Sequence, residues 1–169
     1  MDSDITERSE QLKQAVIEEF SSLAAMVYYL KESTKGFWVS EEVLIEKYFA
    51  SGSRVLDVGC GIGRTTLPLA ALNYRVTGLD LTPTFIEIAQ RLAARVPPEI
   101  DYRVGDCTHL EFPDNTFDNA LFSYNGWCQI PEEANRAQAL REIYRVLRPA
   151  SPADSTGCGY FIFSTHIRR

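Results

Sequence analysis

A glycine-rich turn, followed by an acid at the end of the next predicted strand, indicates a nucleoside-binding site. Gly59, Gly61 and Gly63 alternate directly after a short buried-strand pattern at 55–58, and an apolar helical pattern follows them. Glycine tolerates a positive φ and has no Cβ, so backbone amides in such a turn can approach a ligand closely. Asp80 ends the next strand, where a carboxylate can accept both hydroxyls of a ribose.

The spacing of these glycines argues against a dinucleotide. A dinucleotide fingerprint needs a third glycine where this chain has Arg64, counted from Gly59, or Thr66, counted from Gly61. A phosphate-binding Gly-x-x-x-x-Gly-Lys-Ser/Thr run is also absent. The chain has no recognisable Tyr-x-x-x-Lys or His–acid pair, so a nicotinamide-dependent oxidoreductase is the less favoured enzyme class.

Four ordered segments resemble the motifs of the class I S-adenosylmethionine (SAM)-dependent methyltransferases, whose cofactor carries no phosphate. The matching segments are 57–63 (motif I), 80–81 (motif II), 104–107 (motif III) and 117–123 (motif IV). Residues 141–149 resemble the helix and proline that precede the fifth strand of that family. The resemblance covers about residues 54–166 and implies SAM as the cofactor.

The resemblance implies that the methionine part of the cofactor lies against the glycine turn. Asp57 and the backbone of Gly59, Gly61 and Gly63 would surround this part, with Asp57 acting on the ammonium through the turn. Asp80 would hold the ribose. The alternative for Asp57 is a carboxylate that only stabilises the turn.

The resemblance assigns the adenine to three further residues. Leu81 would pack on the base, Asp106 would accept from the exocyclic amine, and the amide of Cys107 would donate to a ring nitrogen. Ser123 ends the motif IV strand. In the family the end of this strand borders the reactive methyl group, so we expect Ser123 to contact the cofactor. The alternative for Asp106 is a helix cap at the end of a strand.

Candidate catalytic residues follow the fourth strand and the fifth strand. Methyl transfer is an in-line displacement, and it needs a base only when the nucleophile arrives protonated. Tyr124 could border the methyl site, Asn125 could orient an amine or a carboxylate, and His166 could act as a base. The alternatives are a packing tyrosine, an Asn-Gly turn and a solvated histidine in the tail.

The hydrophobic periodicity predicts an α/β protein with a Rossmann-like, doubly wound and mostly parallel sheet. Residues 1–50 are expected to form an N-terminal helical cap, with helices over 5–31 and 40–48, and residues 51–169 the cofactor-binding core. The core is expected to contain strands at 54–58, 75–79, 101–105, 117–123 and 159–164, and helices at 63–71, 83–95 and 132–147.

The chain ends shortly after the predicted fifth strand. The last two of the family's usual seven strands are therefore expected to be missing. The fifth strand would then expose an apolar edge, and such an edge favours pairing with another chain. We expect self-association through this edge, or marginal solubility, as the consequence.

Composition limits the class of protein. The chain has 169 residues, a formal net charge of −6, 45% hydrophobic and 24% charged residues, as expected for one ordinary globular domain. The negative charge argues against a nucleic-acid partner. The absence of a long apolar run and of a signal-peptide pattern argues against a membrane partner and favours the cytoplasm.

The cysteines and histidines do not form a metal-binding pattern. No Cys-x-x-Cys pair occurs, and the histidines are scattered, so we expect free thiols in a reducing compartment and no metal. The residues concerned are Cys60, Cys107, Cys128, Cys158, His109 and His166.

The predicted function is SAM-dependent methyl transfer to an oxygen, nitrogen or carbon nucleophile of a small molecule. The rival from another class is a module that binds the cofactor but is catalytically idle and serves regulation or assembly. Such a module would bind SAM through Asp80 and accelerate no methyl transfer.

Overall fold

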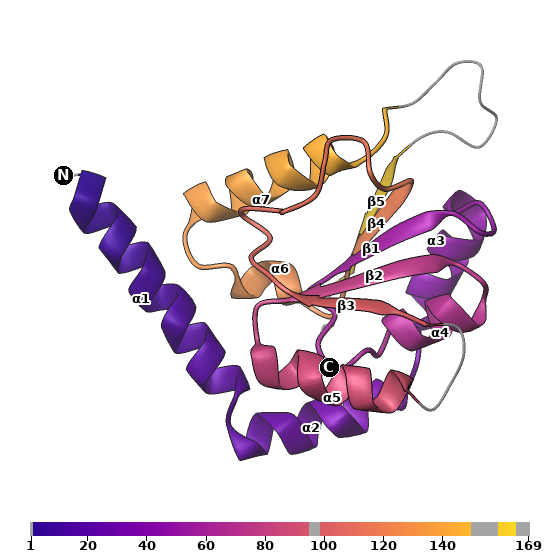
Figure 1. Ribbon diagram of the computed structural model, residues 1–169, viewed down its shortest axis with the longest axis horizontal. Coiled ribbons are helices and arrows are strands. Elements are labelled where there is room, and N and C mark those ends of the chain that lie inside the picture. The colour runs from indigo at the N-terminus through magenta and orange to yellow at the C-terminus, as the bar shows by residue number, and fades with distance from the viewer. Residues whose placement is uncertain (1, 95–98, 150–158, 165–169) are drawn as a thin grey trace.

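The computed structural model describes residues 2–94, 99–149 and 159–164. Within these residues five parallel strands form one sheet in the order β3-β2-β1-β4-β5 (Figure 1). The strands are β1 (Arg54–Val58), β2 (Arg75–Asp80), β3 (Asp101–Val104), β4 (Asn119–Phe122) and β5 (Tyr160–Phe163). The strand order reverses between β1 and β4, which is where ligands bind in doubly wound sheets. The predicted fold class is confirmed.

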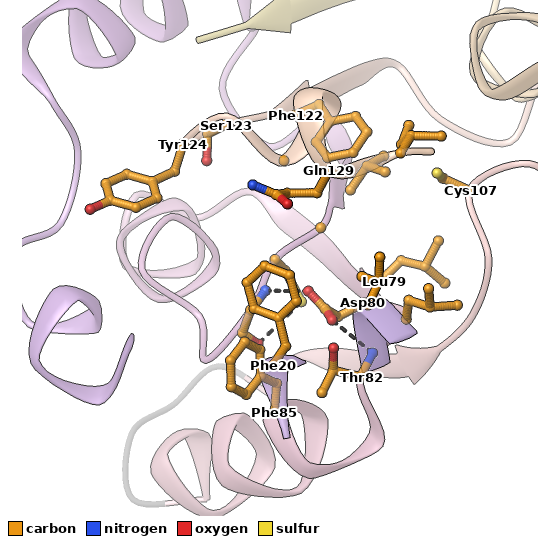
Figure 2. Close-up of a pocket in the computed structure, with 18 of the residues that line it drawn as sticks. Phe20, Leu79, Asp80, Thr82, Phe85, Cys107, Phe122, Ser123, Tyr124 and Gln129 are labelled. Carbon is orange, nitrogen blue, oxygen red and sulfur yellow. Dashed lines mark hydrogen bonds between the residues drawn. The ribbon is translucent and has the colours of Figure 1, made fainter. Parts of the chain in front are cut away.

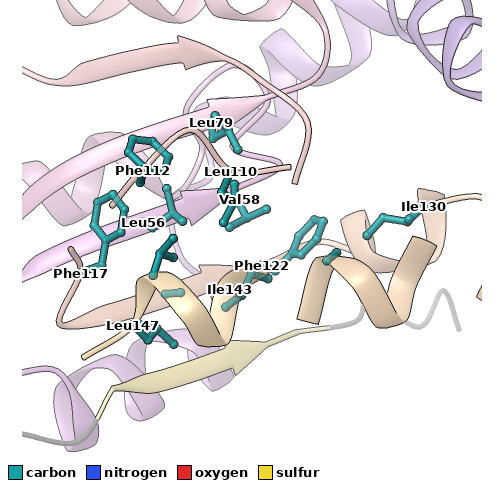
Figure 3. Close-up of a cluster of buried hydrophobic side chains, with 13 residues drawn as sticks. Leu56, Val58, Leu79, Leu110, Phe112, Phe117, Phe122, Ile130, Ile143 and Leu147 are labelled. Atoms are coloured by element: carbon teal, nitrogen blue, oxygen red, sulfur yellow. The ribbon is translucent and has the colours of Figure 1, made fainter. Parts of the chain in front are cut away.

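Helices cover both faces of the sheet, which explains why the central strands β1 and β4 are buried along almost their whole length. On one face lie α3 (Val39–Tyr48), α4 (Thr66–Ala71) and α5 (Pro83–Ala93), and on the other lies α7 (Glu133–Val146) (Figure 1). Figure 3 shows the cluster between the sheet and α7, in which Leu56, Val58 and Phe122 meet Ile143 and Leu147.

The N-terminal segment forms two helices, so the single helix predicted over 5–31 is wrong. They are α1 (Asp2–Phe20) and α2 (Leu23–Ser33), and they meet at an angle (Figure 1). The break occurs because the Ser22 hydroxyl accepts a hydrogen bond from the Ala25 amide at 3.2 Å, which caps α2.

Other element boundaries differ from the prediction by one to three residues, and two of these shifts have clear causes. The fourth strand begins only at Asn119, because Asp118 turns aside to bind the Arg54 amide and the Arg148 side chain, both at 2.7 Å. Helix α4 begins at Thr66 rather than at residue 63, because the glycine turn occupies the residues before it. A short helix, α6 (Gly126–Gln129), lies where a loop was predicted.

The start of α3 also differs from the prediction. The predicted range begins at residue 40, but the helix begins at Val39, and the Glu41 carboxylate accepts the Trp38 amide at 2.8 Å. Ile45 and Phe49 then pack in one cluster with Val55 of β1. The division of the chain at residue 50 stays a prediction.

None of the helices in the described part of the chain is both long and apolar enough to cross a membrane.

Gly59 is a position where an alanine should destabilise the fold. Its φ is +62°, and a Cβ there would lie 2.7 Å from Cε2 of Phe122. Gly52 has a similar φ of +75° but open space around it. We expect Gly52→Ala to lower the free energy of unfolding by about 1 kcal/mol and Gly59→Ala by about 2–4 kcal/mol in urea titrations. Equal losses would show that the contact with Phe122 costs nothing.

The exposed edge of β5 should lead to self-association. β5 is an edge strand among the described residues, and its Phe163 is 41% exposed. We expect sedimentation velocity to show concentration-dependent association that Phe163→Lys reduces, because a charge on an edge opposes pairing. Val104→Lys, on the opposite edge strand β3, is the matched control. A monomer at every concentration would contradict the prediction.

Candidate functional site

A cavity lies at the carboxyl ends of β1, β2 and β4 and is covered by α1 and α2 (Figure 2). Its walls are mainly apolar, with Phe20, Phe85 and Phe122 among them. Eight of the residues predicted from the sequence line it: Gly59, Gly61, Asp80, Leu81, Asp106, Cys107, Ser123 and Tyr124.

The glycine turn joins the ends of β1 and β2. Gly61 has a φ of +56°, and its amide donates to Oδ2 of Asp80 at 2.8 Å. The other carboxylate oxygen of Asp80 accepts the Thr82 amide at 2.8 Å (Figure 2). Burial raises the pKa of Asp80 against the opposing effect of these two bonds. Gly63 lies outside the lining, and a Cβ there would meet the Tyr102 hydroxyl at 2.6 Å.

Asp57 is fully buried beneath the turn and does not line the cavity. Its Oδ2 accepts the hydroxyls of Thr65 at 2.7 Å and Thr66 at 2.6 Å, at the start of α4. Burial raises its pKa to about 6, although both hydroxyls and the Arg64 guanidinium act in the opposite direction. Asp57 thus holds the turn against α4, and any effect on a ligand is indirect.

The end of β3 brings a second carboxylate to the cavity. Oδ1 of Asp106 accepts both the amide and the hydroxyl of Thr108 at 2.8 Å, and Oδ2 pairs with Nζ of Lys13 at 2.7 Å. Burial acts to raise the pKa of Asp106, but Lys13 and Thr108 together hold it below its usual value. Burial raises the pKa of the neighbouring Cys107 thiol to about 12, so this thiol stays protonated.

A buried ion pair lies behind the Ser123 side of the cavity. Arg64 donates two parallel bonds of 2.8 Å to Glu41, and a third of 3.0 Å to the Ser123 hydroxyl. The Gly36 carbonyl accepts from Arg64 at 2.7 Å, and the Ser164 hydroxyl donates to Glu41 at 2.6 Å. Burial acts to raise the pKa of Glu41, but its bonds from Arg64 and Ser164 hold it below the usual range.

Tyr124 lies between the end of β4 and the cap. Its φ of 56°, followed by 62° at Asn125, turns the chain so that the phenol reaches α2. Its ring lies parallel to that of Trp38 with the centroids 6.2 Å apart. Asn125 lies outside the cavity lining, and its backbone amide donates to the backbone carbonyl of Ser164 at 3.2 Å. His166 lies outside the described residues.

The lining residues that were missed from the sequence include Lys13, Glu32, Arg64 and Gln129. Lys13 and Glu32 belong to cap helices that precede every motif. Arg64 was noted only because it occupies the position of a dinucleotide glycine. Figure 2 shows the Gln129 amide extending into the space between β4 and Asp80. The available signal in the sequence was the charge of Arg64, which directly follows an otherwise uncharged turn.

Cys60 and Cys107 line the cavity, but the thiols and histidines of the described residues form no metal-binding cluster. Cys60, Cys107 and Cys128 are free cysteines, and Cys158 lies outside the described residues. His109 is exposed in the loop after β3. Among the residues that the structure describes, no group of three or more His, Cys, Asp or Glu side chains could hold a metal ion.

Comparison with known proteins identifies the family. The model of the methyltransferase domain family matches residues 55–150. A demethylmenaquinone methyltransferase from Symbiobacterium thermophilum is 33% identical over 148 residues, which are 83% of this chain and 57% of that protein. Phosphoethanolamine N-methyltransferase 3 from Arabidopsis thaliana is 33% identical over 118 residues, 69% of this chain and 23% of that protein.

A solved structure agrees with the sequence matches. The crystal structure of a SAM-dependent methyltransferase from Methanosarcina mazei superposes with a TM-score of 0.60 and 30% identity. The match covers 68% of this chain and 55% of that one. The chain therefore spans about half the length of that protein and of the demethylmenaquinone methyltransferase.

Burial of Asp57 should make stability depend on pH. Its pKa rises from 3.8 to about 6 on folding, so between these values the folded state binds more protons than the unfolded state. The contribution of Asp57 is therefore greatest below pH 3.8 and is lost as the pH rises through about 6. The measurement is the free energy of unfolding from urea titrations of the unsubstituted protein and of Asp57→Asn. The difference between the two should fall as the pH rises from 3.8 to about 6. A constant difference would contradict the assignment.

Proposed function

The chain belongs to the methyltransferase domain family, and on that premise we propose that it binds SAM in this cavity and methylates a small molecule. The observation that carries the proposal is the position of Asp80. Its carboxylate ends β2 and accepts an amide of the glycine turn that follows the neighbouring strand β1, where it can hold both hydroxyls of a ribose.

The residues of the cavity fit the three parts of SAM. Gly59 and Gly61 have backbone conformations in the left-handed region and lack a Cβ, so a ligand can approach the backbone of the turn. Each Asp80 oxygen accepts one backbone amide, so each has a further lone pair for a ribose hydroxyl. Asp106 can accept the exocyclic amine of adenine, with Leu81 against the base and the Cys107 amide directed to a ring nitrogen.

The protein's part in transfer is to position the acceptor and to exclude water. SAM supplies an electrophilic methyl group on a sulfonium, which needs an aligned nucleophile more than covalent assistance. The apolar walls from Phe20, Phe85 and Phe122 exclude water from the reacting atoms. Ser123 and Tyr124 are the residues that we place at the methyl end. The two relatives are named for methyl transfer to demethylmenaquinone and to phosphoethanolamine, which favours a small acceptor here too.

The rival is a module that binds SAM without turning it over. A binding measurement alone does not separate the two, because both need Asp80. Formation of S-adenosylhomocysteine above the uncatalysed rate, with any acceptor, is expected of the enzyme and not of the idle module.

Loss of the Asp80 carboxylate should weaken cofactor binding. We expect Asp80→Ala to reduce the affinity for SAM and for S-adenosylhomocysteine by about 1.5–3 kcal/mol, because it removes hydrogen bonds to a charged acceptor. Isothermal titration calorimetry of the full chain measures this. Glu87→Ala, an exposed acid on α5, is the matched control and should bind as the unchanged protein does.

Thermal melting of the ligand-free variants separates folding from binding, because Asp80 also holds the Gly61 and Thr82 amides. Unchanged affinity in a folded Asp80→Ala protein would overturn the proposed cofactor site. No binding by the folded, unsubstituted chain would overturn the proposed function.

A further inference from the structure

A carboxylate from the cap faces the methyl end of the cavity. Glu32 on α2 lines the cavity and is only 5% exposed. Its Oε2 accepts the Tyr124 hydroxyl at 3.0 Å, and its Oε1 accepts Nζ of Lys35 at 2.6 Å. A carboxylate has about four acceptor positions, so these two bonds leave capacity for a ligand.

The Glu32 carboxylate belongs to a hydrogen-bonded chain that fixes its orientation. The Tyr28 and Tyr124 hydroxyls are 2.7 Å apart. Because Tyr124 donates its one hydrogen to Glu32, Tyr28 is the donor in this pair. The carboxylate is therefore held in position by side chains on two elements, α2 and the segment after β4.

The cationic side chains of the cavity do not neutralise Glu32. Two such side chains line the described cavity, and each has its own acidic partner: Lys13 pairs with Asp106, and Arg64 pairs with Glu41. Lys35 approaches Glu32 from outside the lining and is itself half-exposed. Glu32 is therefore paired with Lys35, whereas neither Lys13 nor Arg64 bonds to it from within the described lining.

Aromatic rings border the same space. Tyr29 and Tyr124 both line the cavity, with ring centroids 6.2 Å apart and planes at 77°. The faces of such rings attract cations. A buried carboxylate is costly, and a glutamine could make the same bond to Tyr124 at a lower cost. Lys35 already pairs with the acid, and the Arg64 guanidinium lies 5.3 Å from the Tyr124 ring centroid, so a cationic ligand would add to these contacts.

We propose that the methyl acceptor is a primary or secondary amine, which enters as an ammonium and is held by Glu32 and by the rings of Tyr29 and Tyr124. This inference rests on the proposed function and narrows its substrate class. Glu32 binds the cation and does not take its proton, because Lys35 and Tyr124 keep the pKa of Glu32 below its usual value against the effect of burial.

The transfer balances without a further reactant. The bound ammonium first loses one proton to solvent. The freed nitrogen lone pair then forms a bond to the methyl carbon as the carbon–sulfur bond breaks, and that electron pair stays on sulfur. The products are a methylated ammonium, S-adenosylhomocysteine and one proton.

The test compares a cation with a neutral molecule of the same shape. The full chain, saturated with S-adenosylhomocysteine, is titrated with 2-phenylethylamine or with 2-phenylethanol. We expect the amine to bind about ten-fold more tightly than the alcohol, as a charge-assisted hydrogen bond should provide. Glu32→Gln should remove this preference and leave the affinities for the alcohol and for S-adenosylhomocysteine unchanged. Glu42→Gln, an exposed acid on α3, is the matched control and should keep the preference.

Each result has one meaning. Equal binding of amine and alcohol by the unsubstituted chain, or binding of neither, overturns the amine proposal while the cofactor site stands. A Glu32→Gln variant that loses affinity for amine and alcohol alike shows a purely structural role and also overturns it. Failure of the folded chain to bind S-adenosylhomocysteine overturns the proposed function itself, and the amine proposal with it.

Discussion

The buried ion pair between Arg64 and Glu41 is the interaction on which the geometry of the site depends. Arg64 extends from the glycine turn, and Glu41 belongs to α3, so the pair ties the segment before the first strand to the turn after it. Ser123 and Ser164 add the ends of β4 and β5 to the same network. Four segments far apart in sequence are thereby held around one guanidinium–carboxylate pair.

A buried ion pair of this kind fixes the relative positions of its two segments but adds little to the net free energy of unfolding. Desolvation of two charges offsets much of their attraction, whereas removal of one partner leaves a buried charge, which typically costs about 3–5 kcal/mol. The planar fork of Arg64 permits one orientation relative to Glu41. The stacked rings of Trp38 and Tyr124 lie beside this guanidinium, so the orientation also reaches the aromatic wall of the cavity.

The periodic features of the sequence were predictable and the tertiary contacts were not. Parallel strands bring their carboxyl ends to one edge, so Asp80 and Asp106 were expected at the same cavity, and both line it. Glu41 lies in the first turn of its helix, where an acid is common, and nothing local in the sequence indicates its partner Arg64. Glu32 lies in a cap helix whose orientation depends on the break at Ser22, which the apolar repeat did not indicate. Contacts of this kind join segments that are far apart in the chain, so the sequence around each residue does not indicate its partner.

The strand order has a consequence for how the chain folds. Val55 in the central strand pairs with Val76 on one side and with Asn119 on the other. The first pairing is available early in synthesis, whereas the second requires most of the chain and closes a long loop at an entropic cost. Until β4 has been synthesised, β1 has an unpaired edge, although in the folded protein it is paired on both sides. Formation of the reversal point at which the cavity lies therefore depends on the β1–β4 pairing, which has the greater closure cost of the two.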